Sequence, residues 1–274
     1  MSSTPTGSTG SAGSTGRTGR MPAVFIGHGS PMNTLEHNRY TEAWHDFGRS
    51  IPKPSAILAI SAHWYVNATA VTAMQSPPTI HDFYGFPPEL FAVQYDAPGD
   101  PQLADDLVEL VKPTWVGKDQ DSWGLDHGTW SVLTHMFPEA DVPVVQLSID
   151  AGKSLDEHVA LGRALAPLRD RGVLILGSGN VVHHLGRIQW GSPEGGFPWT
   201  KEFDDATRTV MADPTSDLGA LTRHAHFSLA APTPDHFLPL AYVHGLSQAA
   251  EQPADVLVGG YAYGSLSMTS FVVA

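Results

Sequence analysis

The chain has 274 residues, a formal net charge of -13 at pH 7 and no cysteine. The lack of cysteine excludes disulfides, thiolate metal sites and a cysteine nucleophile. The acidic balance argues against nucleic acid as a partner, because few Lys and Arg side chains are available to neutralise phosphates. No apolar run is long enough to cross a bilayer, so we expect no membrane partner and a cytoplasmic location.

The predicted elements begin only after a tail of low complexity. Residues 1–20 are almost entirely Ser, Thr, Gly and Pro, and we predict a disordered tail there because such a composition has little to bury. Residues 21–274 are expected to form the one folded domain of the chain. In chain order we expect strands at 22–26, 55–61 and 70–74, helices at 103–111 and 130–137, a strand at 142–148, a helix at 155–171, a strand at 172–176, helices at 199–211, 218–226 and 236–250, and strands at 256–258 and 266–273.

This alternation of apolar strands and helices predicts the α/β class. We expect one α/β/α layered domain around a mostly buried sheet that is mixed or largely parallel. Ligands of such sheets bind just beyond the carboxyl ends of the strands. The ends of the strands are therefore where functional residues are sought.

Histidine is unusually abundant, with 14 residues against 15 Lys and Arg together. Three predicted strands run directly into a turn that carries a histidine, namely His28, His63 and His183. A lone histidine of this kind is more often structural, but three of them could converge at one sheet edge and bind a metal. The remaining histidines outside the loops discussed next are interpreted as surface or core-edge residues, and only one of His183 and His184 is expected to face inward.

Three further histidines lie in loops that suit a site. His236 is expected in the first turn of a helix capped by Asp235 or Thr233. His127 lies in a polar loop before an apolar helix, which suits proton transfer. His81 lies in an aromatic loop that could border a ring-shaped ligand.

Six motifs in this order resemble one known family. They are Gly27-His28-Gly29-Ser30-Pro31-Met32, Ser61-Ala62-His63-Trp64, Pro78-Thr79-Ile80-His81-Asp82-Phe83, Asp126-His127-Gly128, Gly179-Asn180-Val181-Val182-His183 and Pro234-Asp235-His236-Phe237-Leu238-Pro239. Together they resemble the DOPA 4,5-extradiol dioxygenase branch of the class III extradiol ring-cleaving dioxygenases. The resemblance runs from about Met21 to the C-terminus.

The resemblance implies a mononuclear metal centre that opens a catechol ring, of DOPA or a similar compound, with dioxygen. His28, His63 and His236 would hold the metal, and His183 would be a further ligand or the acid–base residue. His127 would act as a second acid–base or orienting residue. Residues on the substrate side would be Ser30, Trp64 and His81.

The resemblance also bears on the identity of the metal. Iron(II) is expected for activity. Protocatechuate-type relatives have a carboxylate where His236 stands, so this site has one negative charge less. Zinc(II) can therefore also occupy it, in keeping with the general order of metal affinities.

Three other interpretations stay open. A zinc-dependent hydrolase would use a three-histidine site to activate water, although no His-Glu-x-x-His spacing supports it. A non-catalytic metal-binding or small-molecule-binding protein would bind without turnover. The histidines could also be purely structural. A monomer and a dimer fit the sequence equally well.

Overall fold

The computed structural model describes residues 19–274, so the predicted tail lies outside the described residues apart from its last two positions. The strands are β1 (Ala23–Gly27), β2 (Ala56–Val66), β3 (Ala70–Thr72), β4 (Gly117–Asp119), β5 (Val144–Asp150), β6 (Val173–Gly179), β7 (Asp255–Val258), β8 (Tyr261–Ala262), β9 (Leu266–Ser267) and β10 (Ser270–Val273). The α-helices are α1 (Arg39–Ser50), α2 (Pro88–Phe91), α3 (Pro101–Leu110), α4 (His127–Met136), α5 (Leu155–Leu165), α6 (Pro167–Asp170), α7 (Pro198–Met211), α8 (Phe227–Ala230) and α9 (Leu238–Ala250), and short 3-10 helices cover Pro31–Leu35, Leu185–Arg187 and Leu218–Arg223.

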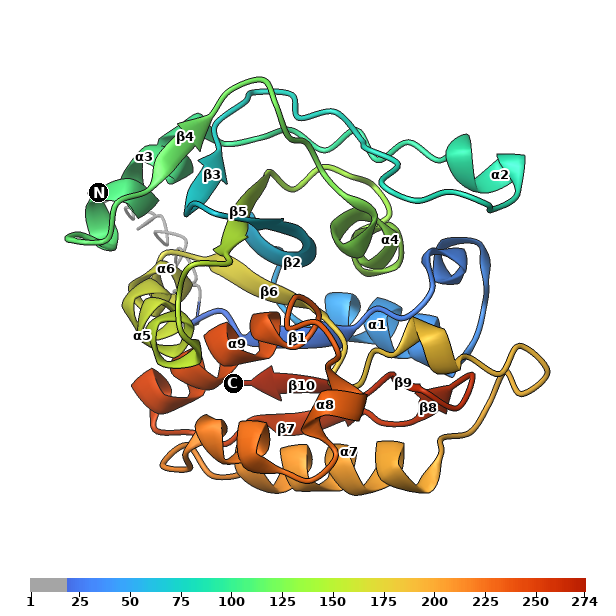
Figure 1. The fold of residues 1–274 in the computed structure, drawn as a ribbon. Coiled ribbons are helices and arrows are strands. Elements are labelled where there is room, and N and C mark those ends of the chain that lie inside the picture. The colour runs from blue at the N-terminus through green and yellow to red at the C-terminus, as the bar shows by residue number, and fades with distance from the viewer. Residues whose placement is uncertain (1–18) are drawn as a thin grey trace, which may run out of the picture.

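Eight strands form one mixed sheet in the order β4-β3-β5-β2-β6-β1-β10-β7 (Figure 1). The central strands β5, β2, β6 and β1 are parallel to one another, whereas β3 pairs antiparallel with β5, and β10 pairs antiparallel with both β1 and β7. Every residue of β1 and β6 is buried, as expected for parallel strands covered on both faces. The predicted α/β layered fold is confirmed.

Helices cover both faces of the sheet and create a hydrophobic core on each. One core is built from the sheet with α3, α5, α7 and α9, and the other from the opposite face with α1 and α4. No helix of the described residues is long and apolar enough to span a membrane. The parallel strands β1, β2 and β6 therefore end at a common edge between two packed layers.

Local chemistry explains where several helices begin and end. The predicted helix at 155–171 is broken, because Pro167 has no N–H to donate and begins α6 instead. Helix α4 begins earlier than predicted, at His127, because the Asp126 side chain accepts a hydrogen bond from the Thr129 N–H. Helix α1 was not predicted, although Asn38 and Thr41 form a capping box at its start.

Two histidines interpreted as surface or core-edge, His158 and His244, are instead fully buried, and His158 lies between two helices. His158 of α5 lies with Nδ1 2.9 Å from the hydroxyl oxygen of Tyr242 in α9. Burial, followed by the charge of Lys153, lowers the pKa of His158 from 6.5 to about 4. The imidazole is consequently neutral in the folded protein at neutral pH.

This shift predicts a specific loss of stability in acid. Between pH 6.5 and 4 the unfolded chain protonates His158 and the folded chain does not, so the stability contributed by this residue falls as the pH falls. At ~1.4 kcal/mol per pKa unit, the wild type should lose about 2 to 3 kcal/mol more than His158→Gln between pH 7.5 and 4.5. Urea unfolding at both pH values measures the difference, with exposed His45→Gln as control. Equal losses in wild type and His158→Gln would contradict the prediction.

Candidate metal centre

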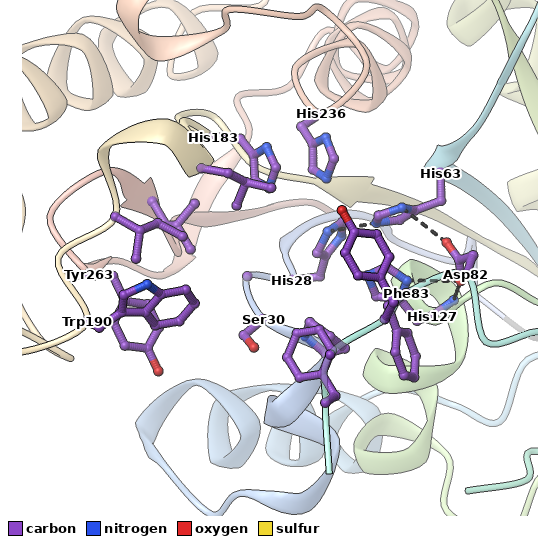
Figure 2. Close-up of a pocket in the computed structure, with 18 residues that line it drawn as sticks. His28, Ser30, His63, Asp82, Phe83, His127, His183, Trp190, His236 and Tyr263 are labelled. Carbon is purple, nitrogen blue, oxygen red and sulfur yellow. Dashed lines mark hydrogen bonds and ion pairs between the residues drawn. The ribbon is translucent and has the colours of Figure 1, made fainter. Parts of the chain in front are cut away.

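A cavity of about 590 Å³ opens at the edge where β1, β2 and β6 end (Figure 2). The described residues that line it are His28, Gly29, Ser30, Pro31, His63, Asp82, Phe83, Tyr84, Gly85, Phe86, His127, His183, Leu185, Ile188, Trp190, His236, Tyr263 and Leu266. Its volume lies within the usual range for a small-molecule site. Five of the histidines singled out in the sequence are thus gathered in one place.

Different local features bring these histidines to the cavity. His28 follows β1 directly, and His183 follows β6 after a short turn. His63 lies inside β2 rather than beyond it, in a stretch where the pairing with β5 shifts register, and such irregularities redirect side chains.

His236 arrives from a distant part of the chain. It lies in a turn before α9 rather than in the predicted first turn, and neither Asp235 nor Thr233 caps the helix. The His236 carbonyl accepts a hydrogen bond from the Asn180 N–H at 2.9 Å. A Cβ on Gly179 would lie 2.2 Å from that carbonyl oxygen, so glycine is required for this close approach.

His28, His63 and His236 form a nearly equilateral triangle of rings. The centroid distances are 5.1 Å for His28–His63, 5.3 Å for His28–His236 and 5.0 Å for His63–His236. In each ring an oxygen lies beside Nδ1, at 2.9 Å for Ser178 Oγ and His28, 3.2 Å for Asp82 Oδ2 and His63, and 2.8 Å for Asp235 Oδ2 and His236.

These oxygens determine which nitrogen carries the proton. Ser178 donates its hydroxyl hydrogen to the Gly128 carbonyl, so its oxygen accepts from His28 Nδ1–H. The carboxylates of Asp82 and Asp235 can only accept, so His63 and His236 also carry hydrogen on Nδ1. Each ring is left with a free lone pair on Nε2, which is the arrangement found around protein-bound metals.

The distances between nitrogens fit a shared ion. His28 Nε2 and His63 Nε2 are 3.3 Å apart. This is about the separation expected when two imidazole nitrogens bind the same ion, each at ~2.1 Å. Two lone pairs this close repel each other, and a cation between them removes the repulsion. The donor set therefore fits a divalent metal ion.

A second grouping shares two members with this triangle. Candidate ligand atoms of His28, His63 and His127 all lie within 4.8 Å of one another. The ring of His127 is 3.8 Å from that of His63 but 5.9 Å from that of His28. Its Nδ1 is 2.9 Å from Asp82 Oδ1 without the geometry of a hydrogen bond, so we count this contact as an ion pair. His236 differs from His127 in that its Nδ1 forms a hydrogen bond with a carboxylate, Asp235 Oδ2 at 2.8 Å, and for this reason we favour the triangle with His236.

Burial keeps the cluster uncharged. Desolvation, followed by the neighbouring histidines, lowers the pKa of His28 and His236 well below 6.5. Burial first and then His127 lower the pKa of His63 to about 3, and burial lowers that of His183 to about 4. Neutral imidazole is the form that binds metal.

Asp82 was not assigned a role from the sequence, yet it links two of the histidines. Its carboxylate forms ion pairs with the rings of His63 and His127 and accepts a hydrogen bond from the backbone N–H of His127 at 2.9 Å. Although burial acts to raise it, the pKa of Asp82 falls to about 2 through the hydrogen bond and charge of His127 and the charge of His63. Its position directly after His81 in the motif was the only available signal.

Replacing Asp82 by asparagine should lower activity strongly with little effect on folding. The amide retains the shape but presents an N–H or a weaker acceptor to His63 and His127, so their ring orientation is lost. Comparable partners of metal ligands contribute ~10–100-fold to activity or metal affinity. We expect kcat to fall within that range in steady-state oxygen uptake, and Asp46→Asn, on the exposed face of α1, serves as control. An unchanged kcat would contradict this role.

The other residues discussed in the sequence divide into those that line the cavity and those that do not. Ser30 and His183 line the cavity, whereas His184 turns away and lies with Nδ1 2.9 Å from the Leu229 carbonyl oxygen. Trp64 and His81 are not among the residues that line it, and their contact with a substrate stays a prediction. Trp64 stacks on Trp123 at 5.7 Å, and the His81 ring lies behind Phe83 with Nε2 2.9 Å from the Val93 carbonyl oxygen.

The fold and the site together define an α/β protein with a histidine-lined metal centre at the ends of parallel strands. The family described as the catalytic LigB subunit of aromatic ring-opening dioxygenase matches residues 22–273, and the chain belongs to this family. The predicted resemblance and enzyme class, an extradiol aromatic ring-opening dioxygenase, are thereby confirmed. Membership implies a metal, a catechol substrate and dioxygen.

Individual relatives cover almost the whole chain. A 4,5-DOPA dioxygenase extradiol of Escherichia coli (strain K12) is 47% identical over 254 residues, covering 91% of this chain and 93% of the relative. A protein of the same description from Beta vulgaris is 38% identical, covering 90% of this chain and 96% of the relative. A crystal structure of an uncharacterized Escherichia coli K12 protein has a TM-score of 0.82 and 42% identity, covering 93% of this chain and 100% of that one.

Proposed function

We propose that this chain opens a catechol ring beside its two hydroxyl groups, with iron(II) held by His28, His63 and His236. The observation that carries the proposal is the triangle of three neutral imidazoles, each with Nδ1 oriented by an oxygen and Nε2 free. When bound, iron(II) supplies open coordination positions for the catechol oxygens and dioxygen. Zinc(II) can occupy the same ligands without supporting the reaction.

Two further histidines flank the triangle and can move protons. His183 stacks on His236 with centroids 3.5 Å apart, and His127 lies beside His63 on the opposite side (Figure 2). His183 is neutral near pH 7, so it can accept a proton from a catechol hydroxyl. The protonated imidazole of His183 can then return the proton to an oxygen as the catechol ring opens. His127 can serve as the second acid–base group.

The remaining wall suits an aromatic ring. Phe83 lies with its ring centroid 5.4 Å from that of His127 at a nearly perpendicular angle, closing one side of the cavity. The product of the reaction contains both atoms of dioxygen, one in a new carboxylate and the other in a new aldehyde. DOPA is one candidate because relatives are described as acting on it. We further propose that the protein is located in the cytoplasm and is a monomer or a dimer.

Anaerobic reconstitution with iron(II) tests the proposal. Protein with one iron per chain is mixed with DOPA and a panel of simple catechols, and oxygen uptake and visible absorbance are followed. Uptake with a new yellow chromophore is the expected result. One bound iron per chain without uptake on any catechol would reject ring opening and favour a binding protein or a zinc hydrolase.

A further inference from the structure

A further carboxylate lies buried next to the metal centre, although it is not among the residues that line the cavity. Asp126 is fully buried at the N-cap of α4. Its Oδ1 accepts hydrogen bonds from Ser61 Oγ at 2.7 Å and from the Thr129 N–H at 3.1 Å. Its Oδ2 accepts from the side-chain amide of Gln146 and from Trp123 Nε1 at 3.4 Å. Four neutral donors therefore surround this carboxylate.

No cationic side chain compensates the charge of Asp126. Within residues 19–274 no Lys or Arg forms an ion pair with Asp126, whereas Asp204, the other fully buried aspartate there, pairs with Arg208 at 2.7 Å. A buried carboxylate with neutral donors alone is costly to ionise. Burial, followed by the charge of Asp82, raises the pKa of Asp126 from 3.8 to about 6, although its hydrogen bonds act to lower it. At pH 7.5 the protein thus contains a buried negative charge without a partner.

The same carboxylate fixes the irregular part of β2 that carries His63. The pairing of β2 with β5 shifts register between Ile60 and Tyr65, and Ser61 lies at the start of this stretch. The Ser61 hydroxyl donates to Asp126, and its oxygen accepts from the His63 N–H at 3.3 Å. Two hydrogen bonds therefore connect the buried charge to the backbone of a proposed metal ligand.

Gly128, in the first turn of α4, brings the carboxylate close to the ring of His63. A Cβ on Gly128 would lie 2.8 Å from His63 Cδ2 and 3.3 Å from Asp126 Oδ1, so the two atoms flank one point. Cδ2 is bonded to Nε2, the nitrogen that is free for the metal. The Gly128 carbonyl also accepts from Ser178 Oγ, which orients His28. The turn that Asp126 caps therefore contacts the surroundings of two proposed ligands.

We propose that Asp126 is a positioning residue whose buried negative charge increases the affinity of the histidine centre for a divalent cation. This inference rests on the metal centre of the proposed function. A divalent ion on three neutral imidazoles is a buried positive charge, and opposite charges attract more strongly in the protein interior than in water. The charge of Asp126 therefore costs stability in the metal-free protein and contributes binding energy when the metal is bound.

Asp126→Asn tests this charge with little change of shape. Asparagine is also a good N-cap residue, and a flip of the Gln146 amide offers its new N–H an acceptor. At pH 7.5 the variant should bind zinc(II) at least ~10-fold more weakly in competition with a chromophoric chelator, as for other partners of metal ligands. Anaerobic titration with iron(II) should show a similar loss. The urea midpoint of the metal-free variant should equal or exceed that of the wild type, because an uncompensated buried charge has been removed.

Asp204→Asn is the matched control. Asp204 is equally buried and accepts hydrogen bonds from three hydroxyls, but its charge is paired with Arg208. Its replacement leaves the arginine without its partner, so the urea midpoint should fall while the zinc(II) dissociation constant stays unchanged. The two variants are thus expected to change stability and metal affinity in opposite ways.

A double variant moves the charge instead of removing it. In Asp126→Asn/Gln146→Glu a carboxylate replaces the amide that contacts Asp126 and accepts from Thr129 Oγ1 at 3.0 Å. The new amide at position 126 and the Thr129 hydroxyl can both donate to this carboxylate. Affinity for zinc(II) should recover most of the loss, which a purely structural role of Asp126 would not predict.

The outcomes separate this inference from the proposed metal centre. Wild-type protein that binds neither zinc(II) nor iron(II), or that binds them equally well after His236→Ala, would reject the centre itself. With one metal per chain in the wild type, an unchanged dissociation constant in Asp126→Asn would overturn the role of the charge. A lower urea midpoint together with weaker binding would also overturn it, as would a folded double variant that binds no better than Asp126→Asn, since both results indicate a purely structural role.

Discussion

His236→Ala is expected to remove stoichiometric iron(II) binding, whereas His127→Ala should retain the iron and lose turnover. His236 has its Nδ1 held by Asp235 and its free nitrogen available as a ligand, while His127 pairs with Asp82 beside the triangle. Loss of a ligand should weaken metal binding by more than the ~10–100-fold typical of an outer-shell partner. Loss of an acid–base group lowers kcat by ~10²–10⁴-fold. Metal analysis after anaerobic reconstitution and desalting, combined with oxygen uptake, measures both.

Two additional variants keep the experiment decisive. His236→Glu supplies a carboxylate ligand at the same position and should recover iron binding, which separates loss of a ligand from misfolding. His184→Ala removes a neighbouring imidazole that points away from the cavity and should change neither quantity. Retention of iron in His236→Ala together with its loss in His127→Ala would instead identify His28, His63 and His127 as the ligands.

Arg169→Ala is expected to destabilise the fold by about 3 to 5 kcal/mol, because it leaves buried main-chain oxygens without a charged donor. The guanidinium is fully buried and donates to the main-chain oxygens of Met21 at 2.6 Å, Val273 at 3.1 Å and Ala274 at 2.6 Å. It therefore connects the start of β1 to the end of β10 at the end of the sheet.

A matched control for Arg169 lies two residues further along the chain. Arg171 forms an ion pair with Asp106 but is half exposed, so Arg171→Ala should cost less than ~1 kcal/mol. Urea unfolding of both variants at pH 7.5 measures the difference. Similar losses in the two variants would show that the buried contacts of Arg169 add nothing beyond a surface pair.

The buried strands could be predicted because each is a nearly continuous apolar run. β1 and β6 are examples, and Gly-rich or Ser-rich turns follow them as expected. Strands were also predicted at β3 and β7, but their antiparallel direction could not be predicted, since it depends on pairing with β5 and β10. Strand direction at an edge is decided by the connections, which local composition does not encode.

Loop residues of the site were harder to assign. In the loop that contains His81, Asp82 and Phe83, the last two face the cavity while the His81 side chain packs behind them. In β2, His63 faces the cavity and Trp64 faces away, where it stacks on Trp123. A shift of one residue reverses the direction of a side chain, so residue type alone cannot choose between neighbours.

The sequence by itself determined the fold class, the absence of thiol chemistry and the histidines that follow strands β1 and β6, His28 and His183, because composition and apolar runs act locally. Only the tertiary structure decided that His236 joins them and that Ser178, Asp82 and Asp235 orient the rings. The His28–Ser178 hydrogen bond spans 150 positions. Such partners meet only after the sheet and its two covering layers have packed, and their hydrogen bonds then determine which nitrogen of each histidine is free to act.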